Sequence, residues 1–132
     1  MVVENGRVEL AYEQPLVIMR MKGTPTGAEV VRSMVDSAKA TEHWPFAVTI
    51  VDLSEQKESL SSEGRKMVAD APPSKVPSRG TALFGASFAM RTLATLLINV
   101  MNITQKNNNP SKFFTTESEA RAWALERAQQ SA

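Results

Sequence analysis

The sequence predicts a single α/β domain with a mixed, mostly parallel sheet, an N-terminal β-hairpin and about four helices. Short apolar runs typical of strands alternate with segments whose apolar residues recur at helical spacing. Alternation of this kind favours parallel strands joined by crossover helices. The length of 132 residues suffices for one domain and is too small for two ordinary ones. We therefore expect residues 1–132 to form one domain with four or five strands.

The first part of the chain is expected to form the hairpin. Asn5-Gly6 is a strong signal for a tight turn, so the first strand is predicted only after it, over residues 7–12. Residues 13–15 indicate a second turn, and residues 16–21 form an apolar run rich in branched side chains. These two strands are close enough in sequence to pair antiparallel.

The middle of the chain alternates between helix and strand signals. Thr26 and Glu29 have the spacing of a capping box, which predicts a helix over residues 28–40. The β-branched run AVTIVDL at residues 47–53 is typical of a strand that is covered on both faces. A weaker helix is predicted from Ser61 or Ser62 to residue 71.

The last third of the chain completes the predicted sheet. A buried strand is expected over residues 81–84 and a short final strand over residues 112–114. Between them, residues 88–103 have only one polar stripe, so this helix is expected to bury most of its circumference. A second capping box, Thr116 with Glu119, opens the last helix, which is expected to pack on the sheet.

Composition removes most catalytic options. The chain has no cysteine, which excludes a disulfide scaffold, a thiolate metal site and a cysteine nucleophile. Its single histidine, His43, has no partner at a spacing that suits a metal site or a general base. The glycine-rich nucleotide motifs and the GxSxG elbow are missing. We therefore expect a non-enzymatic protein with no catalytic residue, no metal and no cofactor.

The charges are nearly balanced but unevenly distributed. The net charge is +1, yet residues 71–116 contain five basic residues and no acidic one. The five are Lys75, Arg79, Arg91, Lys106 and Lys112. Such a segment is able to face an anionic partner, although charges scattered over an ordinary surface are the favoured explanation. It lacks the dense basic stripe with interleaved aromatics that is typical of nucleic-acid binding.

Nothing in the sequence predicts a membrane-spanning segment. The most apolar helix, over residues 88–103, is short for a span and contains Arg91. The N-terminal residues lack the basic region and long apolar run of a secretory signal. A cytoplasmic location therefore fits best.

Two positions near strand ends carry candidate binding groups. Asp52 ends the third predicted strand, where open parallel sheets place functional side chains. Bracing of the following loop by its carboxylate is the favoured alternative. Ser87 begins the helix over residues 88–103, and its backbone amides with Arg91 form a candidate anion site. A simple capped turn is the favoured alternative there.

Several of these segments together resemble a known family. They are the leading hairpin, the strand that ends Val51-Asp52-Leu53-Ser54 and the terminal FFTTESEARAW of residues 113–123. The chain resembles STAS-type domains, specifically the SpoIIAA-like group, which is similar to anti-sigma-factor antagonists. This resemblance implies a regulatory protein-interaction module whose partner is a kinase-like anti-sigma factor, and it leaves a homodimer open.

The resemblance also implies a phosphoacceptor. In the antagonists, a serine at the start of the helix after the Asp-Leu-Ser strand end is phosphorylated by the partner kinase. Counting from Asp52, Ser61 falls on that position and Ser62 follows it, but Leu60 and Glu63 depart from the family pattern. A helix cap is the favoured role for these serines. The implied partner contacts lie in and beside the polar segment of residues 54–65: Asp52, Ser54, Lys57, Glu58 and Arg65.

A second function class stays open beside the regulatory one. The SpoIIAA-like group is also similar in fold to lipid-transfer domains, which implies a domain that binds a small apolar ligand or a lipid. The apolar helix over residues 88–103 and the seven methionines would line such a pocket. Ordinary core packing is the favoured explanation for that helix.

Overall fold

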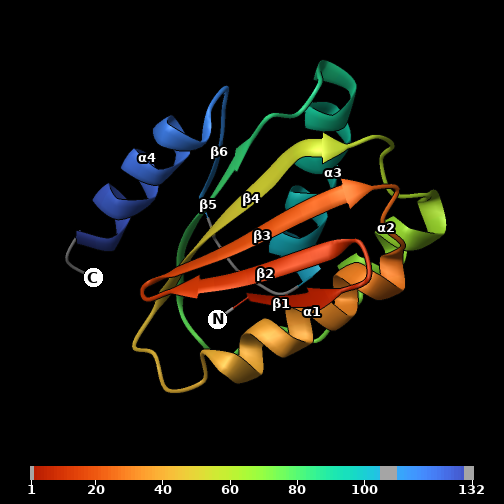
Figure 1. The fold of residues 1–132 in the computed structure, drawn as a ribbon. Helices are drawn as coiled ribbons and strands as arrows, with labels where there is room; N and C mark the ends of the chain where they lie inside the picture. Colours follow the sequence, from red (N-terminus) through yellow and green to blue (C-terminus); the bar gives the residue numbers. More distant parts are fainter. Residues whose placement is uncertain (1, 105–109, 130–132) are drawn as a thin grey trace.

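The computed structural model describes residues 2–104 and 110–129, in which six strands form one sheet and four helices pack on it (Figure 1). The strands are β1 (Val2–Asn5), β2 (Val8–Glu13), β3 (Leu16–Gly23), β4 (Ala47–Gln56), β5 (Ser78–Phe84) and β6 (Ser111–Phe114). The helices are α1 (Gly27–Ala40), α2 (Ser62–Ala69), α3 (Phe88–Thr104) and α4 (Glu117–Gln129). The strands lie in chain order: β1, β2 and β3 pair antiparallel, whereas β3, β4, β5 and β6 pair parallel. The predicted mixed, mostly parallel sheet with an N-terminal hairpin is confirmed.

A strand precedes the first turn as well as following it, since β1 ends at Asn5 and the turn consists of Gly6 and Arg7. β1 pairs with β2 across this turn, with Asn5 opposite Val8. The expectation that the first strand begins after the turn was therefore wrong, and the described sheet has one strand more than the largest number expected. The physical reason is that a two-residue hairpin turn needs a strand on each side, and Val2-Val3 supplies β-branched residues for the first arm.

Local hydrogen bonds explain where the helices begin. At the start of α1, the backbone N–H of Glu29 donates to Thr26 Oγ1 at 3.1 Å, and that of Thr26 donates to the Glu29 carboxylate at 2.9 Å. Thr116 and Glu119 make the same reciprocal pair before α4. Both predicted capping boxes are confirmed. Each satisfies two amide groups that the first turn of a helix leaves without a partner inside the helix.

The two faces of the sheet are covered unequally. α1, α2 and α3 lie on one face, over a core that includes Leu10, Met19 and Leu83. On the opposite face α4 packs closely on β4 and β5, where Ala120 and Ala124 are fully buried. β4 contributes to both cores, as expected for a strand covered on both sides. The helices of the helix-rich face therefore pack less closely on the strands than α4 does on the opposite face.

On the helix-rich face, α1 and α2 touch backbone to backbone, but α3 stands apart from the strands. A Cβ atom at Gly27 would lie 2.6 Å from the Cα atom of Gly64, so only glycine permits this approach of α1 to α2. The backbone of α3 comes close to α2 and hardly approaches the strands. The separation leaves room between α3 and the sheet.

The prediction that α3 buries most of its circumference was wrong. No described residue of α3 is fully buried, and four of its large apolar side chains are exposed: Phe88, Leu96, Val100 and Ile103. The apolar residues on its inner side, including Ala94 and Leu97, are only partly buried against the sheet core. Apolar composition predicted burial here because the sequence does not reveal how far a helix stands from its sheet.

Trp123 of α4 gives a test of the packing on the opposite face. Its ring lies 5.9 Å from the Phe114 ring and fills the space above Gly80, where a Cβ atom would lie 2.8 Å from the indole. We expect Trp123→Ala to lower the free energy of unfolding by about 3 kcal/mol, measured by urea denaturation. Leu125→Ala, which changes an exposed residue of the same helix, is the control and should cost less than about 0.5 kcal/mol. Equal losses for the two variants would contradict the packing described.

Candidate functional site

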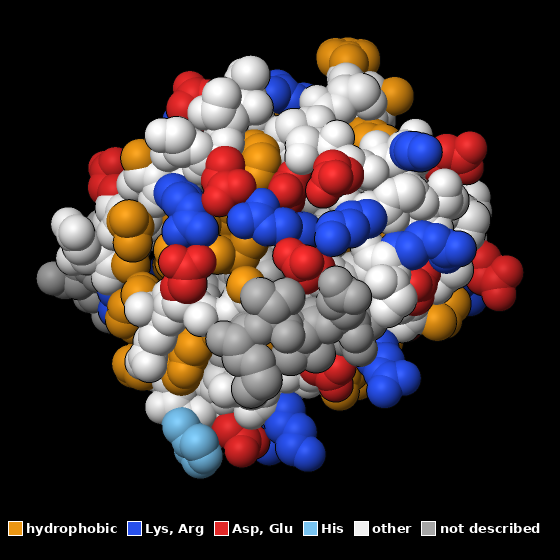
Figure 2. Space-filling view, viewed as in Figure 1, with side chains coloured by type: hydrophobic (Ala, Val, Ile, Leu, Met, Phe, Trp, Pro, Cys, Tyr) orange, Lys and Arg blue, Asp and Glu red, His pale blue; other side chains and the backbone are white. Residues whose placement is uncertain are grey.

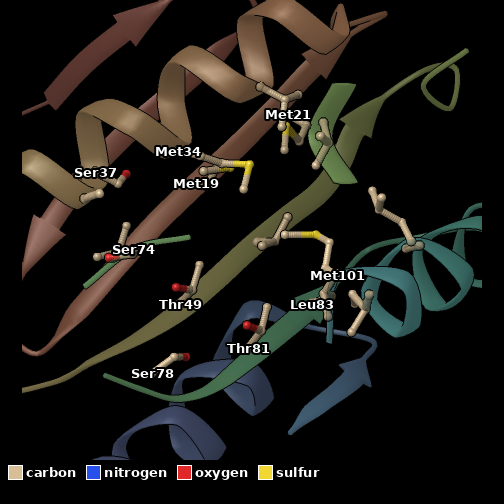
Figure 3. Close-up of a pocket in the computed structure, with 18 of the residues that line it drawn as sticks. Met19, Met21, Met34, Ser37, Thr49, Ser74, Ser78, Thr81, Leu83 and Met101 are labelled. Carbon is tan, nitrogen blue, oxygen red and sulfur yellow. The ribbon is translucent and has the colours of Figure 1, made fainter. Parts of the chain in front are cut away.

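A cavity of about 560 Å³ lies between α3 and the helix-rich face of the sheet (Figure 3). Its walls come from β3, β4 and β5, from the inner sides of α1, α2 and α3, and from the connection of residues 72–78. Sites for small molecules are typically concave spaces of about 300–1,000 Å³ with mostly apolar walls. The cavity has the size and lining of such a site.

Methionines dominate the apolar wall. Five of the seven methionines in the chain line the cavity: Met19 and Met21 from β3, Met34 from α1, and Met90 and Met101 from α3. Methionine is unbranched and polarizable, so it adapts to irregular apolar shapes and is common at surfaces that accept varied partners. A wall of this composition suits a ligand with an apolar body.

The strand register divides the sheet side of the cavity into two layers. Val17, Thr49 and Thr81 lie at one level, as register neighbours in β3, β4 and β5. Two residues further along each strand, Met19, Val51 and Leu83 form the next level on the same face. The sheet wall therefore changes from hydroxyl-bearing to apolar between these two levels, and Ser78, opposite Ala47, adds a hydroxyl before them.

Other hydroxyl groups extend the polar layer. Figure 3 shows the labelled hydroxyl side chains toward one end of the cavity and the labelled methionines with Leu83 toward the other; the hydroxyl residues are Ser37, Thr49, Ser74, Ser78 and Thr81. They come from α1, β4, β5 and the loop between α2 and β5. The cavity therefore has a hydroxyl end and a methionine-lined part, and its lining also includes Gln56, Ser59 and Arg65, from the end of β4 to α2.

Ser37 differs from the other described serines in its surroundings. Its Oγ atom is buried, and it has no hydrogen-bond partner among the residues that the structure describes. One turn earlier on α1, the hydroxyl of Ser33 instead donates to the carbonyl of Glu29 at 2.9 Å. A buried hydroxyl without a partner costs about 1–3 kcal/mol, so it needs an explanation.

The charged residues of the cavity lining are both basic. They are Arg65 and Lys75, and no acidic side chain lines the cavity within residues 2–104 and 110–129. Arg65 is engaged locally, because its guanidinium donates to the carbonyl of Leu60 at 2.7 Å and to Ser62 Oγ at 3.2 Å. Lys75 is exposed and makes no ion pair with a described residue. The cavity thus offers cations and hydroxyls to a ligand.

Asp52, expected as a candidate partner contact, is occupied within the fold. Its side chain faces the α4 side of the sheet and is buried, with Arg20 Nη1 donating to Oδ2 at 2.8 Å. Its other oxygen accepts from the backbone N–H and the hydroxyl of Ser54 at 2.9 and 2.6 Å. The carboxylate braces the start of the following loop, as the favoured alternative expects, and a partner contact by Asp52 stays a prediction.

Arg20 joins Asp52 to a wider ion cluster on that face. The same guanidinium contacts Glu117 at 2.9 Å, and Arg121 links Glu117 at 3.0 Å to Glu13 at 3.1 Å. Figure 2 shows acidic and basic side chains alternating in a row across this face. The hydrogen bonds from Arg20, then those from Arg121, lower the pKa of the Glu117 carboxyl. The cluster is a structural feature that ties β3, β4 and α4 together.

The polar segment of residues 54–65 is largely exposed, as its composition predicts. Ser54, Lys57 and Glu58 are exposed, and Arg65 is half-buried at the cavity wall. Ser61 caps α2, with its Oγ accepting from the backbone N–H of Gly64 at 3.0 Å. Ser62 is the first residue of that helix. The geometry thus gives Ser61 the capping role, and both serines are exposed to solvent.

The candidate anion site and the single histidine make ordinary local contacts. Ser87 Oγ accepts from the backbone N–H of Met90 at 3.3 Å, whereas the Arg91 guanidinium lies 5.5 Å from the Phe113 ring centre. The His43 side chain is 94% exposed in a turn and contacts only Glu42 among the described ion pairs. Lys106 of the basic segment lies outside the described residues. The anion site at Ser87 and Arg91 stays a prediction.

Comparison with known proteins bears on the fold. No family model matches the chain, and no curated protein matches it. A solved structure, an uncharacterized protein of the DUF3478 family with a SpoIIAA-like fold from Shewanella loihica PV-4, superposes with a TM-score of 0.59. The alignment covers 89% of this chain and 91% of that one, at 16% sequence identity. The chain has a SpoIIAA-like fold.

At 16% identity, this similarity establishes the fold of the chain and says nothing about its activity. Two kinds of feature are missing from residues 2–104 and 110–129. No helix among them is long and apolar enough to cross a membrane. Nor do three or more of their histidine, aspartate and glutamate side chains gather as a metal ion would require.

Most residues at the hydroxyl end of the cavity were not predicted from the sequence. Ser37, Ser74 and Thr81 come from segments far apart in the chain and belong to no motif, whereas Lys75 was noted only as a member of the basic segment. The methionine content and the apolar helix over residues 88–103 were the signals that pointed toward a pocket. The strand register could have added Thr49 and Thr81, because both interrupt apolar strands that are otherwise covered.

The ion cluster predicts a specific response to acid. Because the pKa of Glu117 is lowered in the folded state, its stabilising effect is present above its ordinary value of 4.5. That effect is lost as the pH falls through the lowered pKa. We expect Glu117→Gln to reduce the free energy of unfolding near neutral pH, and the difference from wild type to shrink as the pH falls below 4.5.

Denaturant titrations at several pH values measure this difference. Glu126→Gln, on the exposed side of the same helix, serves as the control and should leave the profile unchanged. A difference between wild type and Glu117→Gln that stays constant from neutral to acid pH would contradict the assignment.

Proposed function

We propose that this SpoIIAA-like domain is a non-enzymatic module that binds a small, largely apolar ligand between α3 and the sheet. The observation that carries the proposal is the cavity of about 560 Å³ with five methionines in its wall. A ligand with an apolar body that fills this space makes dispersion contacts with its walls and removes their apolar surface from water. This gain is the source of its affinity.

The position and fit of α3 support entry of a ligand. Its outer side exposes Phe88 and Ile103 to 87% and 77%, and its inner side is only partly buried. Helix α3 therefore has fewer buried apolar contacts than the other elements around the core. Elements with few buried contacts open at low free energy, which suits a wall that has to admit a ligand.

The chemistry of the lining supports binding without turnover. The chain contains no cysteine, and its single histidine, His43, does not line the cavity. The hydroxyl groups at the cavity have no histidine beside them to act as a base, so serine or threonine nucleophiles lack activation. These observations favour a carrier or sensor over an enzyme.

A cavity-filling substitution tests the proposed binding site. Ala94 lines the cavity from α3, whereas Ala89 of the same helix is exposed and does not line it. We expect Ala94→Phe to reduce binding of a fluorescent apolar probe, such as an anilinonaphthalene dye, at least about tenfold, because the ring occupies the probe's volume. Ala89→Phe, the matched control, should bind the probe as wild type does. Equal probe binding by both variants would refute the cavity as the site.

A regulatory contact at residues 54–65 is a second candidate function, favoured by the exposure of Ser61 beside the cavity wall. Leu60, which precedes this serine, and Arg65, four residues after it, both line the cavity. A phosphate on Ser61 would add nearly two negative charges near Glu58 and Glu63, partly offset by the amides at the start of α2. Such a charge would repel an acidic partner surface, so it would act as an off switch for contacts made by Lys57 and Arg65.

Substitution of Ser61 tests the switch. We expect Ser61→Asp to bind an acidic, kinase-like partner at least about threefold more weakly than Ser61→Ala, as measured by calorimetry on the complex. Ser61→Ala also removes the α2 cap and should cost about 1 kcal/mol of stability, so both variants are compared at a temperature where each is folded. If wild type, Ser61→Ala and Ser61→Asp bind equally, Ser61 is only a cap.

A further inference from the structure

We propose that the ligand is a single-chain amphiphile with a monoanionic head the size of a carboxylate, bound with that head at the hydroxyl end of the cavity. Ser37 and Lys75 are the contacts assigned to the head, and the methionine wall holds the chain. This inference rests on the proposed ligand site and adds the chemical class and the orientation of the ligand.

The buried Ser37 hydroxyl is the first observation behind this assignment. Its Oγ has no described hydrogen-bond partner, and Ser37 lines the cavity together with Thr49 and Ser74. A ligand oxygen that accepts a hydrogen bond from Ser37 would remove the cost of the unpaired hydroxyl. A wholly apolar ligand would leave that cost in place, so the geometry favours a ligand with a polar head.

The layered register determines which way such a ligand lies. The hydroxyls of the described sheet wall lie at two successive levels, Ser78 opposite Ala47 and then Thr49 beside Thr81, and the next level is wholly apolar. A chain that starts at these hydroxyl levels and runs along the strands meets Met19 and Leu83 next. The polar head therefore stays near Ser37 and Ser74, as Figure 3 allows the reader to follow.

The charges in the cavity lining indicate which head group the ligand carries. The described lining contains no carboxylate, so nothing there attracts a cation, and Lys75 lies at the hydroxyl end without an ion pair to a described residue. Lys75 follows Ser74 directly in the loop that forms this end. An ammonium at the mouth and hydroxyl donors inside are complementary to a small anion. A cationic head would meet Lys75 and no compensating charge.

Three probes with the same chain and different heads test the proposal by calorimetry on the full chain: decanoate, decanol and decyltrimethylammonium. Wild type should bind decanoate most tightly and decyltrimethylammonium least tightly. Lys75→Gln should weaken decanoate about threefold and leave decanol unchanged. Lys66→Gln, an exposed lysine of α2 that does not line the cavity, is the control and should change neither.

The Ser37 contact is tested in the same assay. Ser37→Ala should weaken decanoate and decanol about fivefold and leave the free energy of unfolding unchanged or raised, because an unpaired hydroxyl is removed. Ser33→Ala, one turn away on α1, breaks an existing hydrogen bond and should lower stability without changing the affinity for either probe.

The outcomes separate the two proposals. If decanol and decanoate both bind but with equal affinity, or if Lys75→Gln behaves as Lys66→Gln does, the anionic head is refuted and the apolar ligand site stands. If Ser37→Ala and Ser33→Ala change probe affinity equally, the assigned orientation is refuted. If no probe binds to wild type, the proposed function itself fails.

Discussion

The distance between α3 and the sheet is the constraint on which the rest of the structure depends. On the same face, α1 and α2 are fixed against each other because Gly27 and Gly64 let their backbones touch. α2 is close to α3, so this pair supports one side of α3 while the strands stay away from it. The apolar groups beneath α3 consequently line a space instead of filling one, and the methionines are the side chains that face it.

The opposite face provides the rigidity that the helix-rich face lacks. Small residues let α4 lie directly on β4 and β5, and the ion cluster around Arg20 joins β3, β4 and α4. Asp52 contributes to this platform and also fixes Ser54 at the start of the exposed loop. The sheet thus separates the loosely packed α3, which forms one wall of the cavity, from the closely packed α4 on the opposite face.

The fold could be predicted from the sequence where the signals are local. The capping pairs at Thr26 and Thr116 and the β-branched run of β4 depend on neighbours within a few residues, and each is found where it was predicted. The strand before Asn5-Gly6 was missed, although the turn implies a strand on both sides. The exposure of α3 could not be predicted, because burial depends on the distance to elements far away in the chain.

Only the apolar composition of the candidate site could be predicted from the sequence. Seven methionines and an apolar helix indicated a lined pocket, yet the same pattern describes ordinary core packing. Asp52 and Ser61 were candidates because they stand at familiar positions, and the structure employs both carboxylate and hydroxyl in local bracing. The hydroxyl end needed the three-dimensional register that brings Thr49 beside Thr81 and the fold that brings Ser37 near them.

Methyl NMR of methionine-labelled protein tests the central claim most directly, because the chain carries its own control. Met19, Met21, Met34, Met90 and Met101 line the cavity, whereas Met67 of α2 is exposed and does not. On titration with decanol, the account predicts saturable shifts of the five cavity methyl signals and an unchanged Met67 signal. Shifts confined to Met67, or no saturable shift of any cavity methionine, would contradict a ligand site between α3 and the sheet.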